Sequence, residues 1–151
     1  MAVSQFEPFC NTHSLDIEVL LSDAPTRTAQ EAADVHGVPV SAIVKSLLVN
    51  ADGKFVLCLV PGDIRMDFDR VKELISASEV RMATPEEVKE QTGYSIGGVP
   101  PFGHTNTLPV LIYPGFDEEG DVVPAAGAGN AVFKIEFKEL KGILQKVTNI
   151  L

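Results

Sequence analysis

The chain has 151 residues, 45% of them hydrophobic and 22% charged, and a formal net charge of −9. A chain of this length is expected to form a single domain over residues 1–151, large enough for its own hydrophobic core. The acidic balance argues against a protein that coats nucleic acid non-specifically, because such binding rests on neutralising many phosphates. A local contact with one nucleic-acid end stays compatible with it.

The sequence shows no sign of export or of a membrane span. No apolar run approaches the roughly 20 residues that cross a bilayer, and Met1–Ser14 lacks the pattern of a secretory signal. Cys10 and Cys58 are interpreted as reduced thiols, with Cys58 in the core and Cys10 near a mobile end. We therefore expect a cytoplasmic protein without a membrane partner.

The first third of the chain predicts helices and a strand in irregular order. Val3–Asn11 has the spacing of a short amphipathic helix, and Leu15–Leu21 alternates as a strand does. Thr26–His36 predicts a helix with candidate N-cap threonines at its start, and Gly37 ends it. A turn or short helix over Pro39–Ile43 follows.

The rest of the chain is richer in strands. An Asp-Gly pair at 52–53 is a hairpin signal between apolar runs at 44–49 and 55–60. A capping box at Thr84–Glu87 starts a helix through 91. The other expected elements are a helix from Asp67 or Asp69 through Ile75, strands at 79–82, 108–113, 122–126 and 131–137, and a helix at 137–147. This order indicates an α+β or α/β domain with a mixed sheet.

The most informative stretch is Gly97-Gly98-Val99-Pro100-Pro101-Phe102-Gly103-His104. Its glycines and prolines fit neither a helix nor a central strand. An ordinary connecting loop is one interpretation. The other is a shaped loop whose backbone N–H groups hold a ligand oxygen, as an oxyanion hole does. Of the histidines, only His104 is placed to join such a site.

Lys45 lies inside an otherwise apolar, strand-like run, Ile43–Val49. By alternation its side chain either points to solvent or reaches into a cleft. In a cleft, the ammonium group is a point charge suited to a phosphate or a carbonyl oxygen. Ser46 is expected on the opposite face of the strand.

Other catalytic patterns are missing from the sequence. Gly127-Ala128-Gly129 lacks the third glycine and the following helix of a dinucleotide-binding fingerprint, so we reject a Rossmann site. The isolated residues His13, His36 and His104 match no metal-ligand spacing. We predict no metal, no cofactor, and a site that positions and polarises its substrate.

Five segments form a recognisable series along the chain. They are Thr28-Ala29-Gln30-Glu31-Ala32-Ala33, Ile43-Val44-Lys45-Ser46-Leu47, Val60-Pro61-Gly62-Asp63, Thr92 to Gly103, and Ala126-Gly127. In this order they resemble the YbaK/ProX family of aminoacyl-tRNA deacylases and the editing insertion domain of bacterial prolyl-tRNA synthetases. The resemblance covers about residues 15–144.

The resemblance implies a compact α+β domain with a mixed, curved sheet and flanking helices. It implies a hydrolase that cleaves the ester between a wrong small amino acid, such as Ala, Cys, Ser or Thr, and the 3′-terminal adenosine of a tRNA. The residues it assigns to catalysis are Lys45, Gly98, Val99, Pro100 and Gly103. Those it assigns to substrate binding are Thr26, Thr28, Ser46, Asp63, Pro101, Phe102, His104, Gly127 and Gly129.

On this resemblance, the terminal adenosine and its ester enter a cleft between the 97–104 loop and the strand that bears Lys45. Lys45 either binds the terminal phosphate or orients the ester, and loop N–H groups stabilise the oxyanion. Water attacks, assisted by a ribose hydroxyl of the substrate. The partner is the 3′ acceptor end of an aminoacyl-tRNA, with a synthetase as a second partner that delivers it.

The chain departs from the family pattern at 126–130. It carries Ala-Gly-Ala-Gly-Asn where many relatives have Ser-Ala-Gly followed by a basic residue and Gly, which removes one cation that could contact a phosphate. Two other functions stay open. One is a non-catalytic module that binds a tRNA end or a synthetase, and the other is a hydrolase of small acyl esters unrelated to tRNA.

Overall fold

The computed structural model describes the backbone of residues 2–151 and the side chains from Gln5 onward. The helices are α1 (Ala2–Thr12), α2 (Ala29–His36), α3 (Phe68–Ile75), α4 (Pro85–Thr92) and α5 (Phe137–Val147), with a 3₁₀ turn η1 (Val40–Ala42). The strands are β1 (Leu20–Leu21), β2 (Ile43–Ala51), β3 (Lys54–Pro61), β4 (Val80–Met82), β5 (Pro109–Ile112), β6 (Asp121–Ala128), β7 (Ala131–Val132), β8 (Ile135–Glu136) and β9 (Asn149–Ile150). In the described residues no helix has the length and hydrophobicity that a bilayer crossing requires.

Most helix ends follow the predicted local chemistry. The Thr28 hydroxyl accepts from the N–H of Glu31 at the start of α2, and Gly37 ends that helix with φ +65°. A complete capping box between Thr84 and Glu87 starts α4. Each of these contacts spans four residues or fewer, so the sequence alone specifies them.

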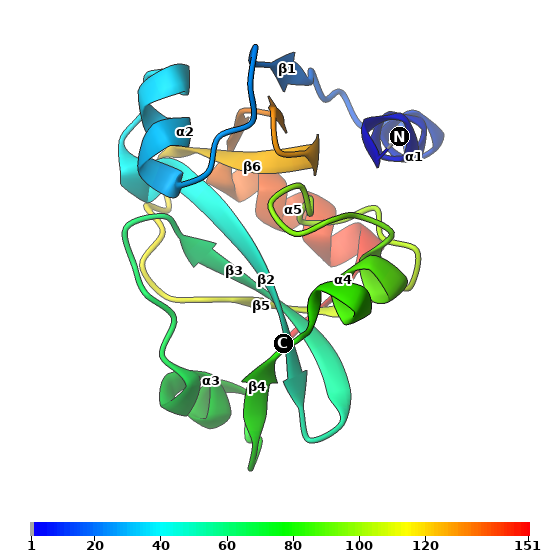
Figure 1. Ribbon diagram of the computed structural model, residues 1–151, viewed down its shortest axis with the longest axis vertical. Coiled ribbons are helices and arrows are strands. Elements are labelled where there is room, and N and C mark those ends of the chain that lie inside the picture. The colour runs from blue at the N-terminus through cyan, green and yellow to red at the C-terminus, as the bar shows by residue number, and fades with distance from the viewer. Residues whose placement is uncertain (1) are drawn as a thin grey trace.

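The strands form one mixed sheet with the order β1-β7-β6-β2-β3-β5-β9, and β4 and β8 pair with β2 and β6. The β2–β3 hairpin is antiparallel, whereas β2–β6, β3–β5 and β5–β9 are parallel. This arrangement, with helices on both faces (Figure 1), confirms the predicted α+β class with a mixed sheet and flanking helices.

The sheet has a gap along one edge of β2. Strand β6 pairs with β2 only at Ile43 and Val44, and β4 pairs with it only from Val49 onward. The N–H of Gly62 on the β3 side donates to the carbonyl of Ile43, and the N–H of Ala83 donates to the Leu48 carbonyl from the other side. Backbone groups alternate along a strand, so those of Ser46 face the gap between β6 and β4.

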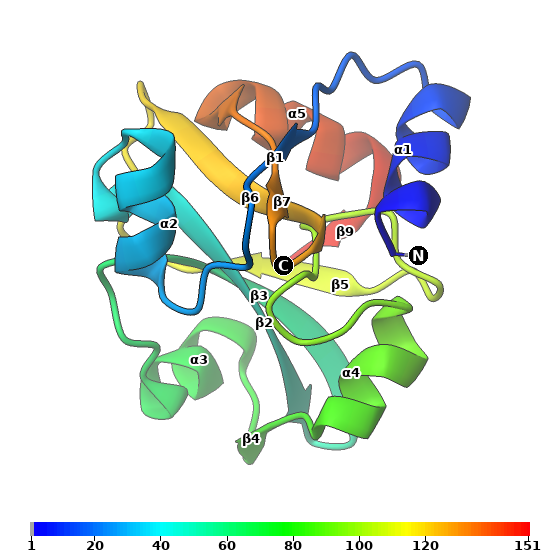
Figure 2. The same cartoon turned by 45° about the horizontal axis from the view of Figure 1, so that its top comes forward.

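Two groups of elements cover the two faces of the sheet. On one face, Phe6 of α1, Val88 of α4, and Leu140 and Leu144 of α5 join the main core with Leu57 of β3. Figure 2 shows the 93–108 segment on this face, next to α4 and the ends of β6 and β7. On the other face, Val71 of α3 packs on Val49, Cys58 and Val60, and Ala32 and Ala33 of α2 pack on Ile43 and Val123.

Two of the predicted strands and the predicted place of Cys10 were wrong, and one strand was missed. The strand expected over 15–21 is limited to β1, because its partner β7 has only two residues. The strand expected over 131–137 is broken into β7 and β8, which pair with different parts of β6. The terminal strand β9 went unpredicted; it pairs with β5. Cys10 is 3% exposed in the core rather than near a mobile end, because α1 packs against that core.

Candidate active site

A cavity of about 300 Å³ lies at the gap in the sheet. Its walls come from the β2 edge between Ile43 and Leu48, the 26–29 segment before α2, the 96–99 part of the loop, the β4–α4 region, and β6 with β7. Because the cavity lies at an edge of β2, residues from both faces of that strand reach its wall, among them Lys45 and Ser46.

The front of the loop, residues 96–99, faces the cavity. Ile96, Gly97 and Val99 belong to its wall, and the Ile96 side chain is 63% exposed at the rim. Gly98 is buried against the end of β6, where an added Cβ would lie 2.8 Å from the Cα of Ala128. Only a glycine allows this contact, so the backbone of Ala128 fixes the position of the loop.

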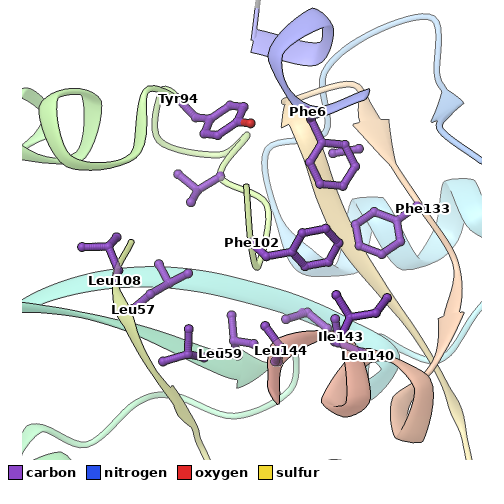
Figure 3. Close-up of a cluster of buried hydrophobic side chains, with 14 of the residues drawn as sticks. Phe6, Leu57, Leu59, Tyr94, Phe102, Leu108, Phe133, Leu140, Ile143 and Leu144 are labelled. Carbon is purple, nitrogen blue, oxygen red and sulfur yellow. The ribbon is translucent and has the colours of Figure 1, made fainter. Parts of the chain in front are cut away.

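The back of the loop, residues 100–104, is part of the core. Phe102 is fully buried, and Figure 3 shows its ring beside those of Phe6 and Phe133. The ring centroid of Phe102 lies 5.4 Å from that of Phe6 and 6.0 Å from that of Phe133. The buried Tyr94 hydroxyl donates to the carbonyl of Gly103 at 2.9 Å. These contacts hold the loop from behind.

His104 also belongs to the back of the loop. Its Nε2 lies 2.7 Å from the carbonyl oxygen of Pro100, which requires Nε2 to carry the hydrogen. Burial lowers the pKa of His104, and the bond to Pro100 opposes that shift. His104 does not line the cavity, so this geometry gives it a role in closing the loop rather than in proton transfer.

The 26–29 segment closes the cavity on the side of α2. The N–H of Thr26 donates to the carbonyl of Gly129 at 3.1 Å, which ties this segment to the β6–β7 turn. The Thr28 hydroxyl is occupied as the N-cap of α2. Arg27, between the two threonines, is exposed and contributes to the cavity wall.

Lys45 and Ser46 point to opposite faces of β2, as expected from alternation. The Lys45 Nζ donates to the carbonyl of Ile64 in the segment after β3. The pKa of Lys45 is lowered by burial, an effect that the negative charge of Asp63 opposes. The Ser46 Oγ is buried and has no hydrogen-bond partner in the described part of the chain.

The structure brings together some of the predicted site residues. Those in the cavity wall are Thr26, Thr28, Lys45, Ser46, Val99 and Gly129, and Gly98 packs directly behind it. Those outside the wall are Asp63, Pro100, Pro101, Phe102, Gly103, His104 and Gly127. The roles of both sets in a reaction stay predictions.

Several wall residues were missed by the sequence analysis. Met82, Ala83 and Val88 come from β4 and α4, whose approach to β2 depends on long-range pairing. Arg27 and Ile96 could have been predicted to line the site. Each has a large side chain and lies in a segment that the sequence analysis had already proposed for the site.

The polar groups of the cavity define what it can do chemically. Its wall contains two cations, Arg27 and Lys45, and three hydroxyl side chains, Thr26, Thr28 and Ser46, but within residues 2–151 no carboxylate and no histidine lines it. The remaining wall is mostly apolar. Such a site can bind an anion and polarise a carbonyl, but it offers no side chain suited to act as general base.

Known proteins share sequence with most of this chain. The model of one family, described as the aminoacyl-tRNA editing domain, matches residues 23–143. The uncharacterized protein YwhH of Bacillus subtilis is 34% identical over 119 residues, 78% of this chain and 75% of that protein. A proline–tRNA ligase of Acidithiobacillus ferrooxidans is 38% identical over 85 residues, which are 56% of this chain and 15% of the ligase.

Solved structures match over almost the whole chain. One described as a candidate trans-editing enzyme for prolyl tRNA synthetase superposes with a TM-score of 0.86 and 34% identity, covering 99% of this chain and 94% of that chain. The hypothetical protein APE2540 superposes with a TM-score of 0.84 and 31% identity, covering 97% of each chain.

Proposed function

Since the chain belongs to the aminoacyl-tRNA editing domain family and is a hydrolase of the aminoacyl-tRNA ester, we propose that it acts in trans on tRNA that carries a small wrong amino acid. The substrate is the 3′ acceptor end of the mischarged tRNA, and an aminoacyl-tRNA synthetase is the proposed source that delivers it.

One observation carries this proposal: the charge of the cavity is opposite to that of the chain. The chain has a net charge of −9, yet the charged side chains of the wall are Lys45 and Arg27. A terminal phosphate placed there meets two cations, and no carboxylate of the described residues belongs to the wall. Binding through one or two phosphates fits a protein whose overall charge disfavours a long contact with nucleic acid.

The loop supplies the candidate donors for the oxyanion. The N–H of Gly98 already donates to the carbonyl of Ser95 at 3.0 Å, so it is not free for substrate. Gly97 and Val99 both belong to the wall, and neither N–H has a partner in the described part of the chain. One well-placed donor of this kind contributes about 2.7–4 kcal/mol to a transition state.

The attacking water needs a base from outside the wall. No carboxylate or histidine of the described residues lines the cavity, so the substrate itself is the proposed source, through a ribose hydroxyl beside the ester. Lys45 and the loop then orient and polarise the ester while water attacks its carbonyl carbon.

The size of the cavity favours a small amino acid. Its volume of about 300 Å³ is at the lower end of the range for ligand sites, and Val44, Leu48, Val88 and Val99 make its wall apolar. We propose Ala, Cys, Ser or Thr as the amino acid removed. An apolar pocket excludes larger side chains but discriminates among smaller ones by only about 1–3 kcal/mol.

The test is deacylation of Ala-, Cys-, Ser- and Thr-tRNA by the wild type, by Lys45→Ala and by Lys54→Ala. Lys54 is exposed in the β2–β3 hairpin, so its variant controls for the loss of one positive charge. We expect rapid hydrolysis of at least one tRNA, about 100-fold slower with Lys45→Ala and unchanged with Lys54→Ala. Hydrolysis of none of the four by the wild type, or hydrolysis of small acyl esters alone, would contradict the proposal.

A further inference from the structure

Lys45 reaches from the cavity wall to a second segment of the chain. Its Nζ donates to the carbonyl oxygen of Ile64, and Ile64 does not line the cavity. The exposed carboxylate of Asp63, one residue earlier, acts on the same ammonium through its charge. The charged end of Lys45 is therefore held at the turn that follows β3, beside the cavity.

This turn is fixed on one side by the start of β2. The N–H of Gly62 donates to the carbonyl of Ile43 at 2.8 Å, and that of Ile64 donates to Pro61 at 3.0 Å. A Cβ on Gly62 would lie 2.4 Å from the carbonyl oxygen of Val40 and 2.9 Å from the Cβ of Ile43. Only a glycine fits here, because the turn packs directly against η1 and the start of the strand that carries Lys45.

The turn is fixed on its other side by Gly115. A Cβ on Gly115 would lie 2.3 Å from the Cδ1 atom of Ile64, so the Ile64 side chain packs directly on that backbone. The residue whose carbonyl accepts from Lys45 is thus packed against the backbone of Gly115 on this side.

We propose that the Pro61–Ile64 turn positions Lys45 for the reaction, with Ile64 as the anchoring carbonyl and Asp63 as a positioning residue that acts through Lys45. The inference rests on the proposed function for its catalytic meaning. An ammonium has three N–H donors, of which one is taken by Ile64 and two stay available for a phosphate or carbonyl oxygen. Asp63 was predicted to bind substrate, whereas here it lies one residue before the carbonyl that binds the Lys45 ammonium.

The first test measures the mobility of the ammonium and needs no substrate. Nitrogen-15 relaxation of the lysine ammonium groups should show an ordered Lys45 and a mobile Lys54 in the wild type. In Gly62→Ala the order of Lys45 should fall to that of Lys54, while Gly53→Ala, which changes a glycine with no neighbour within 4 Å of the added Cβ, leaves it unchanged. A Lys45 as mobile as Lys54 in the wild type overturns the proposal.

The second test is a double-mutant cycle between Asp63 and Lys45, measured as single-turnover deacylation. Asp63→Asn should lower the rate about two- to fivefold in the wild type, with rescue by Asp63→Glu, and should have no effect in Lys45→Ala. Glu73→Gln removes an exposed negative charge paired with Arg70 and should change neither rate. An equal loss in both backgrounds, or no loss in the wild type, overturns the positioning role of Asp63.

The two proposals fail in different ways. A wild type that hydrolyses none of the mischarged tRNAs overturns the proposed function, whereas the relaxation measurement still decides whether the turn holds Lys45. If Gly62→Ala does not fold, Asp63→Asn is measured in the same two assays and decides whether the turn positions Lys45.

Discussion

The front and the back of the 96–104 loop look like one motif in the sequence but differ in what holds them. The back, with Phe102 fully buried, is packed among aromatic rings of α1 and of the segment after β7. The front, with Ile96 63% exposed, has its glycine backbone against Ala128 and its side chains toward the cavity. A single run of glycine and proline can therefore contain both a buried anchor, residues 100–104, and a surface that faces the cavity, residues 96–99.

The largest expected effect tests the anchor. Phe102→Ala removes a fully buried ring, so the free energy of unfolding should fall by about 3–5 kcal/mol, measured by urea denaturation. The distinction between an anchored back and an exposed front would be wrong if Phe102→Ala lowered the free energy of unfolding no more than a substitution at the exposed Ile96.

The next effect tests the contact that joins the front to the sheet. In Gly98→Ala the new Cβ meets the Cα of Ala128 at 2.8 Å, so the loop must move and carry the N–H groups of Gly97 and Val99 with it. A displacement of about 1 Å lowers turnover about 100-fold, measured by deacylation of the preferred mischarged tRNA. Gly53→Ala, whose φ of +87° brings strain without a clash, is the matched control and should keep full activity.

A smaller effect tests the presenting surface. Ile96→Ala truncates an exposed side chain at the cavity rim, so the free energy of unfolding should change by no more than about 0.5 kcal/mol. If the side chain covers bound substrate, kcat/KM should fall roughly fivefold, equivalent to about 1 kcal/mol of lost apolar contact. A loss of stability similar to that of Phe102→Ala would assign Ile96 to the anchor instead.

The smallest expected effect concerns pH and the back of the loop. Burial lowers the pKa of His104 from its ordinary value of 6.5, so below that value the unfolded chain binds a proton that the folded chain does not. Stability that is present above pH 6.5 should therefore be lost as the pH falls toward the folded-state pKa. Thermal unfolding from pH 7.5 to 5 should show a flatter dependence in His104→Gln than in the wild type.

Local chemistry made most elements predictable from the sequence. Thr28, Gly37 and the Thr84–Glu87 box act within about four residues, and each ended or started a helix where expected. The hairpin at Asp52-Gly53 is equally local, and both residues have positive φ. The alternation that separates Lys45 from Ser46 follows from strand geometry alone.

What escaped prediction depends on pairing between distant segments. Strand β9 forms because β5 offers a free edge to Asn149 and Ile150. Two residues are too few to show a strand pattern in the sequence. The cavity likewise depends on where β6 leaves β2 and where β4 joins it. The sequence therefore indicated Lys45 and the loop as site residues, but not the β4–α4 wall opposite them.

The gap beside β2 has a consequence for the evolution of this fold. The cavity exists because β6 and β4 pair with separate parts of β2. Backbone pairing therefore creates the space, and the side chains that line it adjust its shape. Residues such as Ala83, Val88 and Val123, which line it, can be exchanged for others of similar size without closing the space. A lineage can therefore change what the cavity accepts by single substitutions while the scaffold and the anchored loop stay as they are.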